Sequence, residues 1–375
     1  MIPLSLPNLI GNEKKYVQEC LETGWVSTAG AFVQDFESSF AKKVGMKDAA
    51  SIVNGTSALH MAMMQFVQRG EIVILPNLSF VATANAAIYV GAEPYFIDID
   101  KDDWQMDLDL LEEFLHEECE AFEEGTRFRK NRSKIAAIVI VHNQGNMCDM
   151  EKLLTISKKF NIKLIEDAAE SLGSKFKGKD SGTFGEIGCF SFNGNKIITT
   201  GGGGMIVSNN ESILKKIKHL STTAKVDPLR YFHDEVGYNY RMVNILAAIG
   251  LAQLEQLDYF VQKKQEIASF YRNALKNTAD IKFQSINDNV MSNEWLFTIR
   301  TTKAEELMNF LNKSEIMSRP FWMPMSMLPM YKDNYYFSKE DQSRAVHETC
   351  LTLPCSTGIT ANELNLVVQK IKEFF

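Results

Sequence analysis

The sequence predicts an α/β protein, in which a large domain with a mostly parallel seven-stranded sheet precedes a smaller mixed C-terminal domain. Two observations predict this class. Seven short apolar runs before residue 209 alternate with helix-like segments, which is typical of parallel sheets. From Val243 onward the pattern of apolar residues changes, and they recur every three or four positions over a long stretch, as in a helix. We therefore expect the domains to be 1–242 and 243–375.

Each strand candidate is a short apolar run next to turn-forming or helix-like residues. The seven runs are AASIV (49–53), EIVIL (71–75), PYFIDI (94–99), KIAAIVIV (134–141), IKLIED (162–167), GCFSF (188–192) and GMIVS (204–208). The C-terminal domain, which includes WLFTIRT (295–301), is expected to be a compact mixed domain with helices at 304–314 and 361–375. The charged segment 116–134 is expected to be a solvated helix end followed by a loop.

The composition favours a small-molecule partner in a cytoplasmic, soluble protein. A net charge of -7 without a basic tail argues against nucleic acid and against an anionic membrane as main partners. The six cysteines include no C-x-x-C pair, so neither a metal site nor a disulfide framework is expected. The chain has no run of eighteen apolar residues, and its start does not resemble a secretion signal.

One lysine, Lys196, stands between an apolar run and four glycines in FSFNGNKIITTGGGGM (190–205). A P-loop requires a glycine directly before the lysine and a Ser or Thr directly after it, but Asn195 and Ile197 occupy those places. A G-x-G-x-x-G dinucleotide fingerprint is also missing from this region. A lysine in such a turn is either exposed on a loop or confined as a Schiff-base lysine.

Two further motifs suggest ligand contacts at the ends of strands. Gly55, Thr56 and Ser57 open a helix after a strand, where free backbone N–H groups suit a phosphate, although a simple Ser or Thr N-cap is the alternative. Asp167 ends an apolar strand, where a carboxylate requires a cation unless it only initiates a helix. One cofactor, pyridoxal 5′-phosphate (PLP), would explain all three motifs: phosphate at 55–57, ring nitrogen at Asp167 and aldehyde bound by Lys196.

The sequence resembles the nucleotide-sugar aminotransferases of the DegT group, which are fold type I PLP enzymes. The resemblance runs from end to end, through WVSTAGAFVQDFE, NGTSAL, LSFVATANA, EDAAESLG, FSFNGNK, TTGGGGM, VGYNYRM and RPFW. Most similar is the subgroup that aminates C4 of 4-keto-6-deoxy sugars, which includes enzymes of bacillosamine, legionaminic acid and perosamine synthesis.

The resemblance implies roles for particular residues. Lys196 is the catalytic lysine, and the cofactor-binding residues are Gly55, Thr56, Ser57, Phe80, Asp167, Glu170, Ser191, Lys196 and Asn239. Phe80 would stack on the ring, although by itself it reads as a core aromatic residue. Asn239 would reach the cofactor of a neighbouring subunit, which implies a homodimer with shared active sites. The expected substrate-binding residues are Trp25, Ser27, Thr28, Asn195, Arg241, Arg319 and Trp322.

The resemblance also implies L-glutamate as amino donor and a UDP-linked 4-keto-6-deoxy-N-acetylglucosamine as acceptor, in bacterial surface glycan biosynthesis. Alternatives are a GDP-perosamine synthase-like enzyme, a dTDP-sugar 3- or 4-aminotransferase, and a non-catalytic sugar-nucleotide-binding protein. A sugar 3-dehydratase of the family would carry histidine in place of Lys196. Two departures from the family pattern, VHNQGN (141–146) and WMPMSMLP (322–329), suggest that Asn143, Gln144 and Ser326 tune the sugar or nucleotide pocket.

Overall fold

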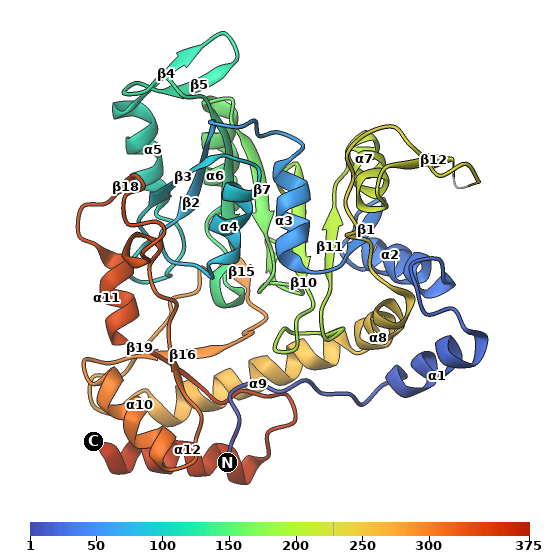
Figure 1. Cartoon of the computed structure of the whole chain (residues 1–375). Helices are drawn as coiled ribbons and strands as arrows, with labels where there is room; N and C mark the ends of the chain where they lie inside the picture. Colours follow the sequence, from blue (N-terminus) through green and yellow to red (C-terminus); the bar gives the residue numbers. More distant parts are fainter. Residues whose placement is uncertain (228) are drawn as a thin grey trace.

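A twisted eight-stranded sheet forms the centre of the computed structural model, which describes residues 1–227 and 229–375 (Figure 1). Its order is β1-β11-β10-β7-β6-β2-β3-β18. The strands are β1 (Ala49–Ile52), β2 (Ile72–Pro76), β3 (Glu93–Ile97), β6 (Ile135–Val141), β7 (Lys163–Asp167), β10 (Ile187–Ser191), β11 (Gly204–Val207) and β18 (Tyr336–Phe337). The seven predicted strands are confirmed.

The sheet is parallel except at β11, which runs antiparallel to both of its neighbours, β1 and β10. The predicted count of seven omitted β18, a two-residue strand from the C-terminal part of the chain that pairs in parallel with β3. A run of two residues is too short to show the alternation by which strands are recognised in a sequence.

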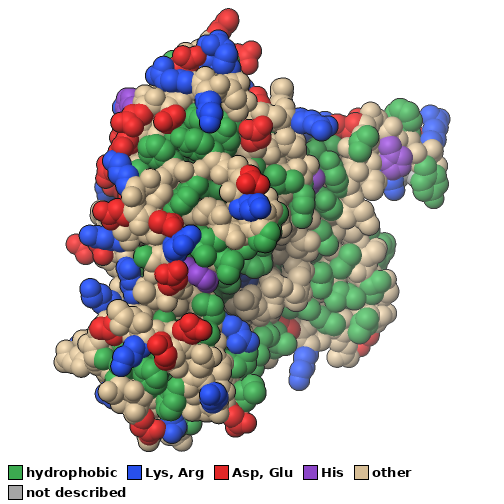
Figure 2. All heavy atoms as spheres, turned by 60° about the vertical axis from the view of Figure 1, so that its left-hand side comes forward, with side chains coloured by type: hydrophobic (Ala, Val, Ile, Leu, Met, Phe, Trp, Pro, Cys, Tyr) green, Lys and Arg blue, Asp and Glu red, His purple; other side chains and the backbone are tan. Residues whose placement is uncertain are grey.

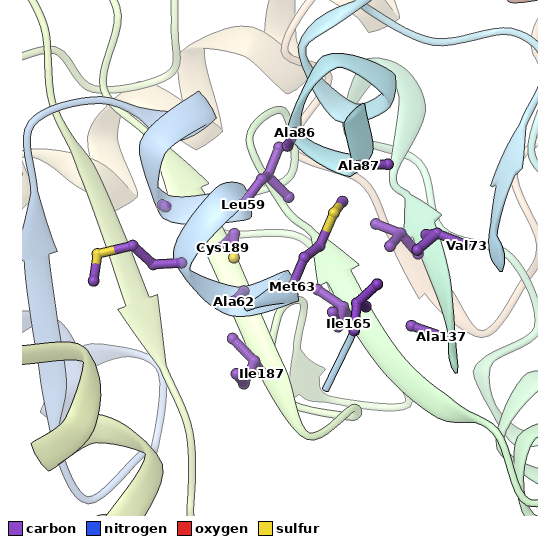
Figure 3. Packing of buried hydrophobic residues seen from close by; sticks show 14 of the residues in the cluster. Leu59, Ala62, Met63, Val73, Ala86, Ala87, Ala137, Ile165, Ile187 and Cys189 are labelled. Atoms are coloured by element: carbon purple, nitrogen blue, oxygen red, sulfur yellow. The ribbon is translucent and has the colours of Figure 1, made fainter. Parts of the chain in front are cut away.

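Helices cover both faces of the sheet, because successive residues of a buried strand point to opposite sides. In β2, Val73 packs in the cluster under α3 (Gly55–Met63) and α4 (Ala82–Tyr89), whereas Ile74 packs in the cluster under α5 (Leu108–Glu117) and α6 (Met150–Lys159). Figure 3 shows Met63 of α3 close to the sheet residue Ile165. A third cluster joins β10 and β11 to α2 (Ala31–Lys43).

The C-terminal part has its own sheet and core. An antiparallel sheet of four strands, β14 (Lys282–Phe283), β16 (Phe297–Arg300), β19 (Cys350–Leu353) and β17 (Arg319–Pro320), packs with α10 (Ala304–Lys313), α12 (Ala361–Phe374) and the second half of α9 (Leu257–Leu275). Both predicted helices are confirmed, and the segment WLFTIRT contains β16. The helical stretch after Val243 is two helices, α8 (Asn244–Leu254) and α9.

The two parts of the chain exchange segments near the predicted boundary. Helix α8 packs against α1 (Glu13–Thr23) and α2, whereas Ile2 from the N-terminus packs in the C-terminal core. In Figure 1, accordingly, the N-terminus lies beside the C-terminal helices. The division into 1–242 and 243–375 therefore stays a prediction.

Short elements complete the fold. The segment 116–134, expected to be a helix end followed by a loop, contains the end of α5 and then the hairpin of β4 (Cys119–Phe122) and β5 (Gly125–Phe128). Charged residues pair across its strands, as Arg127 does with Glu120. A second hairpin, in which β12 pairs with β13, projects from the body as an arm (Figure 1). The remaining elements are β8 (Lys175–Phe176), β9 (Lys179–Asp180), β12 (Lys225–Asp227), β13 (Phe232–His233), β15 (Val290–Met291), α7 (Glu211–Ser221), α11 (Gln342–Thr349) and the 3-10 turns 143–145 and 325–327. Within 1–227 and 229–375, no helix has the length and apolar character needed to cross a bilayer.

A partly buried carboxyl group, Asp103, lies in the turn after β3. Its backbone carbonyl accepts hydrogen bonds from the side chains of Asn146 and Gln284, so the turn is tied to the loop after β6. Burial, with smaller contributions from the nearby acidic residues, raises the pKa of Asp103 to about 7. The folded state therefore binds this proton more tightly than the unfolded chain, whose value is near 3.8.

We expect wild-type protein to lose stability relative to Asp103→Asn as the pH rises from 5 to 8. The protonated carboxyl favours folding most below the unfolded pKa, and its contribution is lost as the pH passes about 7. The loss between pH 5 and 8 should be at most roughly 3 kcal/mol, because it accumulates only up to about pH 7, and it is measured by urea denaturation at both pH values. Asp35→Asn, at an exposed position of α2, is the matched control. A constant difference between wild type and Asp103→Asn would contradict the assignment.

Candidate active site

A cavity of about 400 Å³ opens at the carboxyl ends of the parallel strands. Val141 at the end of β6, Asp167 at the end of β7 and Ser191 at the end of β10 line it, together with the N-terminus of α3. This edge is where open α/β sheets bind their ligands. One residue from each of the three sequence motifs, Gly55, Asp167 and Lys196, lines this cavity.

The start of α3 forms a narrow cradle. A Cβ atom added to Gly55 would lie 2.7 Å from Cβ of Ser191, so a side chain there would displace a residue of the cavity wall. The N-cap is Asn54, not Thr56 or Ser57, and its Oδ1 accepts the N–H of Ser57 at 2.7 Å. The first N–H groups of a helix have no partner within the helix, so those of Gly55 and Thr56 suit an anion.

Two buried carboxylates face the cavity. Asp167 accepts the hydroxyl of Thr83 at 2.6 Å and the N–H of Ala169 at 3.1 Å. Glu170 accepts the backbone N–H of Gln144 at 2.8 Å. Burial raises the pKa of both carboxyl groups, and neighbouring hydrogen bonds and Lys196 oppose that rise only in part. The pair therefore favours positively charged groups in the cavity.

Glu166, next to Asp167 on β7, points to the opposite side of the strand and serves the fold. Its carboxylate accepts the N–H groups of Gly182 and Gly185 at 2.8 and 2.7 Å and contacts Nε2 of His142 at 3.0 Å. These contacts fix the strand end from which Asp167 projects.

Lys196 lies inside the cavity and is not an exposed loop lysine. Its Nζ is 3.5 Å from Oε1 of Glu170 and 3.8 Å from the ring centroid of Trp295. Its side chain is 11% exposed. The loop that carries it is pinned by backbone hydrogen bonds from Phe192 to Gly203 and from Thr200 to Phe192. A confined amine between a carboxylate and an aromatic ring can act as a nucleophile or as a proton carrier.

The structure brings most of the predicted residues together. Those that line the cavity are Gly55, Thr56, Phe80, Asp167, Glu170, Ser191, Asn195, Lys196 and Trp322. Phe80 is half exposed and packs edge-on against Trp322, so it is not a core aromatic residue. Thr83 and Trp295 also belong to the site and were missed. Thr83 stands three positions after Phe80, within the quoted motif LSFVATANA, but Trp295 carries no local signal.

Other predicted residues do not line the cavity within this chain. They are Ser57, Trp25, Ser27, Thr28, Asn239, Arg241 and Arg319. Ser57 is buried in α3, whereas Trp25 and Asn239 are exposed. Arg241 forms an ion pair with the buried carboxylate of Glu37, which is the structural alternative for an arginine. The ligand roles expected of these residues stay predictions.

The residues at the two departures from the family pattern lie behind the cavity wall. Asn143 is fully buried and donates to the carbonyl of Leu78 at 2.8 Å, and Ser326 bonds the side chain of Asn77. Gln144 has a φ of 62° and holds Glu170 through its backbone N–H. None of the three residues lines the cavity, so the hypothesis that they tune the sugar or nucleotide pocket stays a prediction.

The residues present fit PLP, because the cavity combines an anion cradle, a buried acidic pair and a confined lysine, as PLP sites require. The fold and site define a PLP-dependent transferase. The chain belongs to the DegT/DnrJ/EryC1/StrS aminotransferase family, whose model matches residues 7–372.

Curated relatives cover nearly the whole chain. GDP-perosamine synthase of Escherichia coli O157:H7 is 38% identical, over 100% of this chain and 98% of the relative. The putative pyridoxal phosphate-dependent aminotransferase EpsN of Bacillus subtilis is 36% identical, over 100% and 96%. UDP-4-amino-4,6-dideoxy-N-acetyl-beta-L-altrosamine transaminase of Campylobacter jejuni (strain 81-176) is 33% identical, over 91% and 89%.

The fold matches a solved structure of the same kind. Helicobacter pylori PseC, an aminotransferase of pseudoaminic acid biosynthesis, superposes with a TM-score of 0.89 at 24% identity, over 100% of this chain and 99% of that one. Fold, family and relatives agree, and the chain is a PLP-dependent nucleotide-sugar aminotransferase.

We expect Gly55→Ala to weaken PLP binding by about tenfold or more, because its Cβ would push against Ser191 in the cradle. Absorbance titration of the apoenzyme measures this affinity. Gly194→Ala is the matched control, since a Cβ there would have no atom of the described residues within 4 Å apart from those of its chain neighbours. Equal affinities for PLP in the two variants would show that the cradle does not hold the phosphate.

Proposed function

We propose that the enzyme transfers an amino group from L-glutamate to C4 of a nucleotide-linked 4-keto-6-deoxy sugar. The observation that carries the proposal is the placement of Lys196 and the carboxylates of Asp167 and Glu170 in one enclosed cavity. The amino sugar would serve bacterial surface glycan biosynthesis of the O-antigen type, and we place the enzyme in the cytoplasm.

The name of the 38% identical relative supports a GDP-linked sugar in place of the UDP-linked sugar expected from the sequence. We therefore propose a GDP-linked 4-keto-6-deoxy hexose as acceptor. A UDP-linked N-acetyl sugar is the second candidate, supported by the relative from Campylobacter jejuni at 33% identity.

Different residues of the cavity would bind different parts of the cofactor. When bound, PLP supplies an aldehyde that reacts reversibly with amines and a ring that accepts an electron pair. Gly55, Thr56 and Ser191 would hold its phosphate, Asp167 its ring nitrogen and Glu170 its ring hydroxyl. Phe80 would cover one face of the ring.

Lys196 would carry protons at Nζ. As a free amine it can take a proton from the substrate carbon and return it elsewhere, so one residue serves both halves of the reaction. Because the amino group passes from the donor to the enzyme before the acceptor receives it, we expect ping-pong kinetics. Asn195 Oδ1 and Trp322 Nε1 have no hydrogen-bond partner within the described residues, which supports their proposed contacts with substrate.

We further propose a homodimer with shared active sites. The projecting hairpin exposes Leu229, Tyr231 and Phe232, and Val236 follows it. Figure 2 shows hydrophobic side chains on this arm and on the flank of the body below it. Asn239, which follows the arm and is exposed, would reach the neighbouring subunit's cofactor.

The proposed reaction is tested with GDP-, UDP- and dTDP-linked 4-keto-6-deoxy sugars and ¹⁵N-labelled L-glutamate. We expect label at C4 of the GDP-linked sugar, with at least about tenfold higher kcat/KM than for the UDP-linked one. Lys196→Ala is the control for background exchange. A preference for the UDP-linked sugar would move the proposal to the second candidate. Absence of label from all three sugars would contradict it.

We expect Asp167→Asn to lower kcat by roughly 10² or more, because a neutral amide cannot balance a positively charged ring nitrogen. The Oδ1 of the asparagine can still accept the N–H of Ala169, and its Nδ2 can donate to the hydroxyl oxygen of Thr83, so the fold should persist. Thermal unfolding and cofactor titration, measured beside turnover, separate the electrostatic effect from misfolding. Unchanged turnover would assign Asp167 a structural role.

A further inference from the structure

Trp295 is a fully buried aromatic residue that the C-terminal part of the chain contributes to the cavity. It precedes β16, and one face of its indole lies against the amine of Lys196, with 3.8 Å between Nζ and the ring centroid. An ammonium group over an indole face is attracted by the negative charge of the π system. The amine thus has an aromatic contact on one side and Oε1 of Glu170 at 3.5 Å.

The indole is held from several directions. Its Nε1–H donates to the carbonyl of Asn195 at 2.7 Å, directly before Lys196 in the chain. The backbone N–H of Trp295 donates to Oδ1 of Asn293 at 2.9 Å. Its carbonyl accepts Nζ of Lys264 at 2.7 Å, a lysine that is itself only 3% exposed. Moving the ring would therefore break the hydrogen bond of its Nε1–H, and the two backbone hydrogen bonds fix the segment from which the ring extends.

The same segment also fixes the carboxylate on the other side of the amine. Asn293 Nδ2 donates to the carbonyls of Glu170 and Leu172, both at 2.9 Å, and its N–H donates to Ser174 Oγ at 2.9 Å. Residues 293–295 consequently hold the turn of Glu170 and the loop of Lys196 in one arrangement. These hydrogen bonds connect the C-terminal part of the chain to the turn of Glu170 and to the loop of Lys196.

We propose that Trp295 is a positioning residue for Lys196. Its indole face holds the lysine amine whenever that amine is not covalently attached, and its N–H fixes the loop from which the amine extends. The inference rests on the proposed role of Lys196, which must be free during part of each half-reaction and must then return to the cofactor. An amine held in place reacts as if at high local concentration, whereas a mobile one does not.

A purely structural role would have a different consequence. Trp295 also packs near Trp322, with ring centroids 6.5 Å apart, and belongs to the C-terminal core. If packing were its whole role, replacing it would lower thermal stability and the affinity for any ligand together. A positioning role instead slows the steps that need the free amine and leaves noncovalent binding unchanged.

The test compares wild type with Trp295→Leu and Trp295→Phe. Apoenzyme is mixed with PLP in a stopped-flow instrument, and the absorbance change of covalent attachment at Lys196 gives a rate constant. Noncovalent affinity is measured separately with pyridoxamine phosphate, which cannot attach. Trp295→Leu should attach PLP at least about tenfold more slowly and keep its affinity for pyridoxamine phosphate within about twofold. Trp295→Phe, which retains a ring face, should recover most of the rate.

Trp104→Phe is the matched control, since Trp104 is equally buried and packs on Phe321, outside the cavity. It should leave both quantities unchanged. Attachment by Trp295→Leu at the wild-type rate would overturn the inference, as would a parallel loss of pyridoxamine phosphate affinity. If Trp295→Leu does not fold, Trp295→Phe alone tests the ring face. An attachment rate for Trp295→Phe below a tenth of the wild-type rate would then overturn the inference. Failure of wild type itself to attach PLP would instead overturn the proposed function.

Discussion

The burial of two carboxylates beside one amine is the constraint on which the rest of this structure depends. Asp167 and Glu170 are nearly inaccessible to water, and Lys196 lies within 3.5 Å of one of them. Removing such charges from water is unfavourable unless each meets an opposite charge. One amine offsets one carboxylate, so the cavity is suited to a ligand that brings a second positive charge. A pyridinium ring meets that requirement, and its phosphate finds the helix start at Gly55.

The fold delivers these groups through elements that are far apart in sequence. Strand β7 presents Asp167, the turn after it presents Glu170, and the loop after β10 presents Lys196. The backbone of Gln144 and the side chain of Thr83 fix the carboxylates, and the 293–295 segment closes the arrangement from the C-terminal part. Because Glu170 and Trp295, which contact the amine, are each hydrogen-bonded to backbone groups, the protein holds both in place without a ligand.

Sequence reasoning recovered what is encoded locally. The seven longer strands show apolar runs, and Gly55, Asp167 and Lys196 belong to motifs whose spacing implies one site. It could not recover β18, whose two residues form a strand only because β3 offers a free edge. It could not recover Trp295 either, because its contact with Lys196 joins positions about a hundred residues apart and exists only after both parts pack. It could not show either that Asn143 and Ser326 bond Leu78 and Asn77, or that the backbone of Gln144 holds Glu170, because these contacts join distant parts of the chain. Arg241 illustrates the same limit, since no local pattern reveals its buried partner Glu37.

The most direct test of the central claim is chemical mapping of the cofactor attachment. Holoenzyme is reduced with borohydride, digested and analysed by mass spectrometry, with Lys196→Ala treated in parallel. The account predicts a single phosphopyridoxyl group on Nζ of Lys196 in wild type and none in the variant. A label on another lysine, or an unlabelled wild-type protein, would contradict it.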